Sequence, residues 1–532
     1  MDFFNQTYLA AELPPSLAPA LFVVSDLLDA PVKLGVTTAI TALVSFLAYQ
    51  AYRPSVDKRS PAFTSDTLPI IGSFGFVTRQ WSFWKNAVKE SRTGNFSFWQ
   101  GKRHLIGISG RNARIMLLDH PQLCFISGQS LLAFGLHFWP PIHKAFHGTG
   151  ERNSSYFLKT LLPLLKTARL ERVFKGAMED ASTDFKKLTT THPNGVINAP
   201  TLWRTVFRQN ARLFISDDFV HDQALFKKIS DHLDVLLHSY SPFYAFLRWI
   251  PEPSMIRRRI ARQGIRKIIQ NLIADRKKNG TKYKDDPLAM MMANGDDEEN
   301  ITEFCTSATF ITSTNAHVIF PQLIETMAVH PDWQEKCYRE IVAAANIYNK
   351  DTSLPLIDRI QSIPMRAWET SFPNLEMCMY EIIRVWTSFA AGRLNISGKA
   401  IPIPDSNEVI PPGAFAIWNS TELNFNEELF PTPHKFDPER FKEGRREFEK
   451  EPYGFFGWGA GQHPCAGKRW GKLQQTILVA HALALYKWSS CDENGNKDPH
   501  AAQRQDLGVE LDSEAKFALP AAYCKFEPRQ PL

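Results

Sequence analysis

The stretch FFGWGAGQHPCAGKRWG, residues 455–471, places a single cysteine, Cys465, in a glycine-rich loop. Gly457, Gly459 and Gly461 carry no side chain, so the backbone there can lie close against a flat, bulky group. Apolar residues recur at helical spacing after the cysteine, which predicts a helix that begins near it. A helix N-terminus stabilises a thiolate, and a thiolate held against a large planar ligand indicates a haem-iron ligand. The alternative is an ordinary core cysteine beside a glycine-rich turn.

This stretch resembles the haem-binding signature of the cytochrome P450 family, with matches at Gly461, His463, Cys465 and Gly467. The family usually has Phe seven residues before the cysteine, whereas this chain has Trp458, which is also a large aromatic residue. The resemblance implies that Cys465 is the axial thiolate ligand of a haem b (iron protoporphyrin IX). It also implies that His463 takes the place of a basic residue that hydrogen-bonds a haem propionate.

Length and composition bound the class of protein. The 532 residues are 44% hydrophobic, so the chain can form one large catalytic domain or two or three smaller ones. A net charge of +6 from 61 basic and 55 acidic residues is too mild to indicate nucleic-acid binding. The seven cysteines include no C-x-x-C pair, so neither a zinc ribbon, an iron–sulfur cluster nor a disulfide framework is indicated. A reducing compartment is the simplest interpretation for most of the chain.

Residues 34–52, LGVTTAITALVSFLAYQAY, predict a single membrane-spanning helix. They carry no charge and are long enough to cross a hydrocarbon core of about 30 Å. Basic residues follow directly, which predicts that the chain after the span faces the cytosol and that residues 1–33 form a lumenal tail. The membrane is then predicted to be that of the endoplasmic reticulum. An Asn-Gln-Thr sequon at Asn5 would then be open to glycosylation. A buried core helix is the alternative.

A proline-rich linker over residues 53–73 follows the predicted span, because its prolines prevent a helix from continuing. It resembles the hinge between the anchor and the catalytic domain of membrane-bound P450s. Alternating segments then predict short strands up to about Gly110, and helix-like stretches follow. With the resemblance, this predicts a mainly α haem-thiolate fold with a small β region over residues 74–532, plus the N-terminal transmembrane helix.

An aromatic-rich segment at residues 125–146 would correspond to the family's substrate-facing loop, with ordinary core packing as the alternative. Its aromatic and imidazole side chains include Phe134, His137, Phe138 and Trp139. The family's usual Trp-x-x-x-Arg pair, which binds a haem propionate from the next helix, is not found here. Lys159 and Arg169 are weak substitutes for it.

An apolar run at residues 301–330 predicts a long helix, which acidic residues 296–299 start and Pro331 stops. In the family this helix crosses the haem, and an acid followed by threonine helps deliver protons to dioxygen. The family's usual interval from Pro331 puts Thr314 at the acid position and Asn315 at the threonine position, so the pattern is departed from at both. Steroid 7α-hydroxylases and prostacyclin synthases of the family also have Asn there. The hydroxylases are monooxygenases, whereas the prostacyclin synthases are isomerases. A capped or solvent-facing polar pair is the alternative.

Glu381 and Arg384 lie three residues apart in a predicted helix, so both charges share one face. Such pairs are also frequent on surface helices. The run FDPERF at residues 436–441 resembles the family's loop that adds an arginine, here Arg440, to a structural Glu–Arg–Arg cluster. Arg393 lies where relatives place a propionate-binding arginine, and the residues between it and Arg384 would line the pocket.

The resemblance implies a membrane-anchored monooxygenase that uses O2 and receives electrons from NADPH through a separate flavoprotein, the NADPH-cytochrome P450 reductase. That reductase would dock near Lys468, Arg469 and Lys472, which offer positive charge beside the cysteine. The aromatic-rich segment and the membrane anchor favour a lipophilic small molecule as the substrate. The resemblance to fungal members implies a sterol, terpenoid or polyketide pathway. Two alternatives stay open: an isomerase that needs no reductase, and a non-enzymatic haem-binding sensor.

Overall fold

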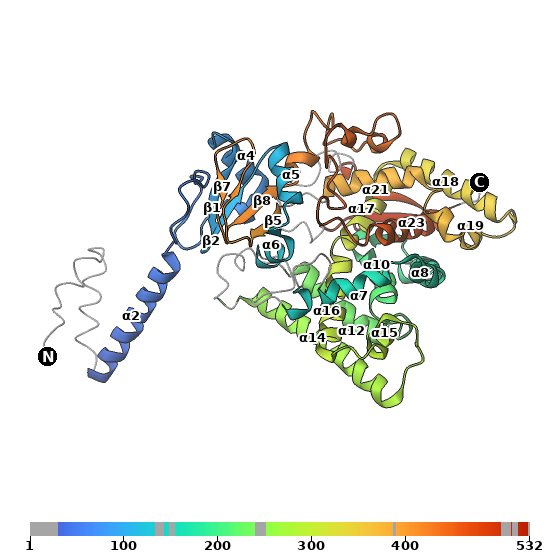
Figure 1. Cartoon of the computed structure of the whole chain (residues 1–532). Helices are drawn as coiled ribbons and strands as arrows, with labels where there is room; N and C mark the ends of the chain where they lie inside the picture. The colour runs from blue at the N-terminus through green and yellow to red at the C-terminus, as the bar shows by residue number, and fades with distance from the viewer. Residues whose placement is uncertain are drawn as a thin grey trace.

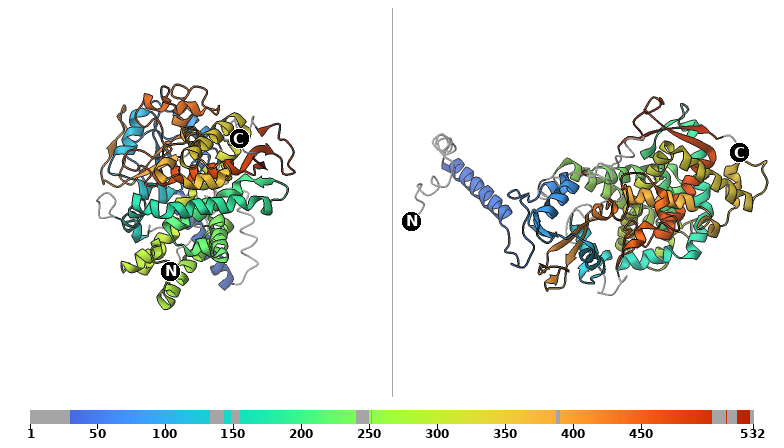
Figure 2. Two further views of the ribbon diagram at one scale, coloured as in Figure 1. Left: turned by 90° about the vertical axis from the view of Figure 1, so that its right-hand side faces the viewer. Right: turned by 90° about the horizontal axis from the view of Figure 1, so that it is seen from above.

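The protein is described from a computed structural model, which covers residues 30–132, 143–147, 155–239, 250, 252–386, 390–501, 512 and 520–529. Figure 1 shows a large helix-rich part, a smaller strand-rich part beside it, and helix α2 (Ala30–Ala51) extending away from both. The same projection of α2 is seen from above in Figure 2. The predicted mainly α fold with a small β region is confirmed.

The helix-rich part holds most of the long helices. The longer helices after α2 are α4 (Gln80–Glu90), α5 (Arg111–Asp119), α6 (Phe125–Leu132), α7 (Tyr156–Leu164), α8 (Thr167–Lys186), α10 (Trp203–Phe214), α12 (Gln223–His238), α14 (Pro253–Asn279), α15 (Pro287–Ala293), α16 (Glu298–Thr314), α17 (Ala316–Val329), α18 (Pro331–Tyr348), α21 (Pro373–Trp386) and α23 (Lys468–Leu485). Short helical turns join them: α3 (Gly75–Thr78), η1 (Lys144–Phe146), α9 (Leu188–Thr191), η2 (Ala199–Leu202), α11 (Asp218–His221), α19 (Leu356–Arg359), η3 (Ile360–Ser362), α20 (Met365–Trp368), α22 (Thr421–Asn424), η4 (Pro438–Phe441) and η5 (Glu447–Lys450).

Helix α10 contacts α16, α17 and α23 at the centre of this part, and α17 also contacts α16 and α23. Side chains such as Phe207, Ala308, Leu323 and Ile477 are fully buried there. The amphipathic α10 buries one apolar face against these neighbours, whereas the more apolar α17 is surrounded by other elements.

The largest sheet joins strands from the two halves of the chain in the order β1-β2-β8-β5-β3. Its strands are β1 (Phe96–Gln100), β2 (Arg103–Gly107), β8 (Phe415–Asn419), β5 (Ala390–Asn395) and β3 (Leu123–Cys124). Strands β2 and β8 run parallel, and the other neighbours are antiparallel. Gly128 of α6 packs directly on β5, because a Cβ there would lie 2.5 Å from the Cα of Arg393. The sheet therefore brings the start of α6 beside Arg393.

Two smaller sheets complete the described strands. One has the order β4-β10-β9, with β4 (Val196–Asn198), β10 (Tyr523–Pro528) and β9 (Tyr486–Cys491). The other pairs β6 (Ile401–Pro402) with β7 (Val409–Ile410). Strand β9 directly follows α23, so the β10 pairing fixes the C-terminal end of that helix.

Helix α2 is the one helix among the described residues that is long and apolar enough to cross a membrane. Its apolar window is Leu34–Ala51, with a mean hydropathy of 1.5 and no part buried against the protein. The alternative of a buried core helix is therefore wrong. Just after α2, Arg53 donates to the carbonyl of Gly101, and Lys102 lies over the ring of Tyr49. These contacts join the end of the helix to the turn between β1 and β2.

The predicted helix over residues 301–330 is two helices in the structure. Helix α16 ends at Thr314 and α17 begins at Ala316, so the interruption falls at Asn315. Asp297 caps the start of α16, because its carboxylate accepts the backbone N–H of Asn300 at 3.2 Å. Pro321 lies inside α17, beyond the interruption.

Candidate functional site

Cys465 lies in an irregular loop that leads into α23. Its backbone N–H donates to the carbonyl of Trp458 at 2.6 Å, and α23 begins at Lys468. All seven cysteines are free; five are buried, Cys124 is half-buried, and Cys465 is exposed. Cys465 is therefore the most exposed of the seven cysteine residues.

The glycines of this loop serve the loop's own fold. Gly459 and Gly461 have φ of 65° and 63°, in the left-handed region that favours glycine. A Cβ on Gly461 would lie 2.3 Å from the carbonyl oxygen of Leu118, and one on Gly459 would lie 2.6 Å from that of His463. The sequence interpretation assigned these glycines to the approach of a flat ligand, whereas the structure shows them meeting protein backbone. Gly467, by contrast, has no protein atom within 4 Å of its ideal Cβ position.

The thiol of Cys465 does not have the low pKa that a helix N-terminus alone would give. Desolvation by the surrounding protein raises the pKa of Cys465, and the backbone N–H of Gly467 and the charge of Lys468 oppose this rise only in part. In the protein alone the thiol form of Cys465 is therefore favoured. A bound metal deprotonates a coordinating thiol outright, so the predicted thiolate form of Cys465 would require a bound metal.

Arg393 is a buried cation that has no anionic partner among the residues the structure describes. It is 2% exposed on β5, and its guanidinium donates to the adjacent carbonyl of Gly392 at 3.0 Å. Its Nε atom has no hydrogen-bond partner, and no carboxylate of the described residues pairs with it. Burial lowers the pKa of Arg393 to about 10. Because an unpaired buried charge is costly, this site suits an anionic group such as a haem propionate.

His463 and Arg393 meet at a third side chain, Phe125. The ring of Phe125 lies 4.7 Å from the guanidinium carbon of Arg393 and stacks on His463 at a centroid distance of 5.1 Å. The two residues predicted to contact propionates are thus brought together at one place. Sequence reasoning gave Phe125 no such role, since only the pairing of β3 with β5 brings it there.

Of the two weak substitutes for the Trp-x-x-x-Arg pair, Arg169 already has other partners. Arg169 is buried on α8 and donates to the carbonyls of Asp285 at 2.6 Å and Arg212 at 3.2 Å. It therefore holds a junction of the helices and is not available to a propionate, which corrects the prediction. Lys159 is exposed on α7. The predicted pocket residues 134–139 and 387–389 lie outside the described residues.

Trp458, at the position where the family has Phe, holds the loop against two helices. Its ring lies 6.5 Å from that of Tyr380 on α21. A Cβ on Gly471 of α23 would lie 3.2 Å from the same indole. Glycine at that point of α23 therefore makes room for the tryptophan.

Glu381, Arg384 and Arg440 form one buried cluster, and all three side chains are fully buried. The carboxylate of Glu381 accepts both Nε and Nη2 of Arg384 at 2.8 Å, and Nε of Arg440 lies 3.3 Å from it. The remaining guanidinium donors go to backbone carbonyls of residues 424–433 and to Glu447. The cluster therefore fixes α21 to the segment that leads into the Cys465 loop.

Thr314 and Asn315 lie at the interruption between α16 and α17. The hydroxyl of Thr314 donates to the carbonyl of Phe310 at 2.6 Å, so it is used within the helix. The side chain of Asn315 is exposed, and Ile311, one turn earlier, is 44% exposed. Both residues are therefore accessible although α16 and α17 are otherwise mostly buried.

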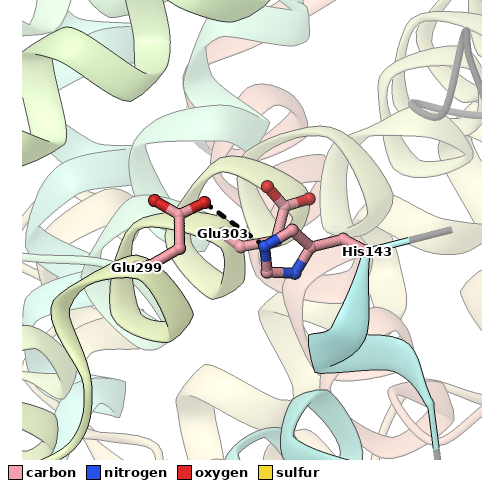
Figure 3. Close-up of side chains that lie close together, drawn as sticks. All are labelled: His143, Glu299 and Glu303. Atoms are coloured by element: carbon pink, nitrogen blue, oxygen red, sulfur yellow. Dashed lines mark hydrogen bonds and ion pairs between the residues drawn. The ribbon is translucent and has the colours of Figure 1, made fainter. Parts of the chain in front are cut away.

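A separate group at the start of α16, drawn in Figure 3, resembles a metal site in its residue types. His143, Glu299 and Glu303 place their ligand atoms within 4.8 Å of one another. However, Arg266 contacts both carboxylates at 2.7 Å, and Arg262 contacts Glu303 at 2.7 Å. Two cations already neutralise the two carboxylates, so the group is an ion-pair network that joins α14, α16 and residues 143–147.

The basic residues next to Cys465 are mostly paired. Arg469 contacts Glu369 at 2.6 Å, and Lys472 pairs with Glu376. Lys468 has no ion-pair partner within the described ranges and lines a hollow of about 430 Å³ with Trp368 and Ala466. Of the three positive charges predicted beside the cysteine, two are therefore paired with carboxylates.

Comparisons with known proteins identify the family of this chain. The sequence profile described as Cytochrome P450 matches residues 66–511. Cytochrome P450 monooxygenase claM of Passalora fulva is 44% identical over 505 residues, covering 94% of each chain. Cytochrome P450 monooxygenase nsrP of Aspergillus novofumigatus is 42% identical, covering 94% of this chain and 96% of its own.

The solved structure of retinoic-acid-bound cyanobacterial CYP120A1 has a TM-score of 0.63 and covers 89% of this chain and 100% of its own. At 16% identity it shows the fold alone. The family match extends over most of the chain and includes the Cys465 loop, the Glu381 cluster and the interrupted helix. The chain therefore belongs to the cytochrome P450 family and is a P450 monooxygenase.

Proposed function

We propose that this monooxygenase is anchored in the endoplasmic reticulum membrane and oxidises a lipophilic small molecule, an intermediate of a fungal sterol, terpenoid or polyketide pathway. The observation that carries the proposal is the combination of an accessible Cys465 with an accessible Ile311 and Asn315 in the centre of the protein. The accessible isoleucine offers an apolar surface, as a lipophilic substrate requires.

The residues that would hold the haem fit it in charge and access. Cys465 would ligate the iron, and Arg393 would pair with a propionate. His463, which stacks on the Phe125 ring that also contacts Arg393, would lie at the same end of the haem. When bound, the haem supplies the O–O cleavage chemistry that a thiolate ligand promotes. The buried Glu381 cluster would keep the cysteine loop in register with α21.

Asn315 would supply the polar group beside the reaction. Thr314 is committed to the Phe310 carbonyl, whereas the Asn315 side chain makes no hydrogen bond to the described residues. An amide donates and accepts hydrogen bonds, so Asn315 would position water that carries protons. The alternative within the same fold, an isomerase acting on a substrate that already contains an O–O bond, needs no such proton supply.

Reaction type is tested by turnover of candidate sterols, terpenoids and polyketides under ¹⁸O-labelled dioxygen. Product formation is expected to require both NADPH and the reductase and to place one labelled oxygen atom in the product, with the other leaving as water. Loss of acid–base help at Asn315→Ala should lower the rate by about 10²–10⁴-fold.

Two results would contradict this assignment. Unlabelled product formed without NADPH and reductase would establish the isomerase. Haem binding without substrate-dependent turnover of any candidate would establish the haem-binding sensor. Docking of the reductase near Lys468 is part of the same proposal, and Lys468→Glu should lower the rate of electron transfer while leaving the spectrum unchanged.

The membrane arrangement is a second proposal: residues 1–33 lumenal, 34–52 spanning, 53–73 a linker and 74–532 the cytosolic catalytic domain. It is supported by the exposed apolar face of α2 and by Arg53, Lys58 and Arg59 after it. Protease added to sealed microsomes is expected to remove the catalytic domain. A glycan on Asn5, lost in Asn5→Gln, should mark the lumenal tail. Protection of the whole domain would reverse the orientation.

A further inference from the structure

A single buried amide, Asn210 on α10, joins the two helices that carry the site. Asn210 is 1% exposed. Its Nδ2 donates to the backbone carbonyl of Thr312 on α16 at 2.9 Å. Its Oδ1 accepts from the indole Nε1 of Trp470 at 3.0 Å and from Nε2 of Gln474 at 3.0 Å, both on α23.

The partners of Asn210 fix which way its amide points. The indole N–H of Trp470 can only donate, and the carbonyl of Thr312 can only accept. The amide oxygen must therefore face α23 and the amide nitrogen must face α16. Both halves of the side chain are used, so an apolar residue of the same size could not replace either contact.

The carbonyl that Asn210 holds is at the interruption of the helix. In an unbroken α-helix the carbonyl of Thr312 would accept the backbone N–H of Ala316, four residues later. Here α16 ends at Thr314, and that carbonyl accepts the side chain of Asn210. The next residues are Thr314 and the exposed Asn315, and the other end of the contact lies on α23, which follows Cys465.

We propose that Asn210 is a positioning residue for the monooxygenase reaction: by holding the Thr312 carbonyl, it keeps the turn at Asn315 open and in fixed register with the helix that follows Cys465. The catalytic part of this proposal rests on the proposed role of Asn315. The structural part of the proposal, that Asn210 keeps the turn open, does not depend on that role. Asn210 itself touches neither the haem space nor the substrate, so it acts through Asn315.

The test compares Asn210→Leu with Gln209→Leu in the holoenzyme. Gln209 is the neighbouring buried amide on α10, and its Nε2 donates to the carbonyl of Ala177 at 2.8 Å, away from α16. Both changes remove one buried amide of similar size. A second variant, Asn210→Asp, keeps an oxygen acceptor for Trp470 and Gln474 and removes the amide donor, which guards against simple misfolding of Asn210→Leu.

The first readout is backbone hydrogen–deuterium exchange of the peptide that covers residues 311–319. Released from Asn210, the Thr312 carbonyl is free to accept the N–H of Ala316, so exchange in this peptide is expected to slow at least threefold in both Asn210 variants and to stay unchanged in Gln209→Leu. Unchanged exchange in the Asn210 variants would overturn the proposal, and so would an equal change in Gln209→Leu.

The second readout is coupling, measured as product formed per NADPH consumed, with hydrogen peroxide as the by-product. Misplacing Asn315 is expected to lower coupling by roughly 10–100-fold while the thiolate absorption band stays intact. Slowed exchange with normal coupling would overturn the catalytic part and locate the fault in the proposed role of Asn315. Slowed exchange with lost coupling supports both parts.

Discussion

Cys465→Ala is expected to abolish the red-shifted Soret band that a thiolate-ligated haem shows when the reduced protein binds carbon monoxide. The thiolate is the only strong covalent link between iron and protein in this family, and alanine leaves no ligand atom at that position. Monooxygenase activity should fall to background with it, because the thiolate's electron donation is what promotes O–O cleavage. The measurement is the difference spectrum of reduced protein with and without carbon monoxide.

Cys124→Ala is the matched control for this variant. Cys124 is half-buried and directly precedes Phe125, and its thiol donates to Ser127 at 3.4 Å. It therefore lies near the same end of the site without being placed to ligate iron. The control should keep the band. A Cys465→Ala protein that keeps it would show that another cysteine is the ligand.

Local motifs made much of this site predictable from sequence. Cys465 and its glycines lie within one short loop, and Glu381 and Arg384 share a helix face because of their spacing alone. Arg440 was predictable because its loop has a recognisable run of residues. In each case the chemistry is encoded by neighbours in the chain, so no tertiary information was needed.

Contacts between distant segments were not predictable in the same way. Phe125 lies between Arg393 and His463 because β3 pairs with β5, and Asn210 reaches Thr312 because α10 packs on α16. A lone asparagine in a helix gives no signal in the sequence that it will hold a carbonyl one hundred residues away. Such partners become visible only when the helices are packed.

Two electrostatic features of the site have the same physical origin. From the sequence, Arg469 is a positive charge, but its partner Glu369 lies a hundred residues earlier and neutralises it. Likewise the backbone N–H of Gly467 and the charge of Lys468 lower the pKa of the Cys465 thiol, but desolvation by the surrounding protein raises it more. Local sequence shows the charge or the dipole, whereas the tertiary fold determines what surrounds it.

Glu381→Gln is expected to be the most destabilising single change outside the cysteine loop. The variant keeps the size of the side chain but removes the anion that balances the fully buried Arg384, while Arg440 keeps Glu447 at 3.0 Å. Removing one partner of a buried ion pair costs about 3–5 kcal/mol, because the remaining charge is left uncompensated. Since a folded protein is stable by only about 5–15 kcal/mol, the variant should lose most of its folded, haem-bound population.

The comparison that isolates burial is Glu449→Gln. Glu449 pairs with Arg446 at 3.1 Å, but both side chains are about half exposed, at 53% and 51%. An exposed pair contributes less than about 1 kcal/mol, so this variant should unfold at nearly the same urea midpoint as the parent protein. Both variants are followed by circular dichroism and by the thiolate band. If Glu381→Gln shifts the midpoint no more than Glu449→Gln does, the cluster is not what holds α21 to the cysteine loop. If Arg384→Gln added to Glu381→Gln partly restores the midpoint, the cost lies in the unpaired charge, because Glu381 is the carboxylate that pairs with Arg384 within the described residues, whereas Arg440 keeps Glu447 at 3.0 Å.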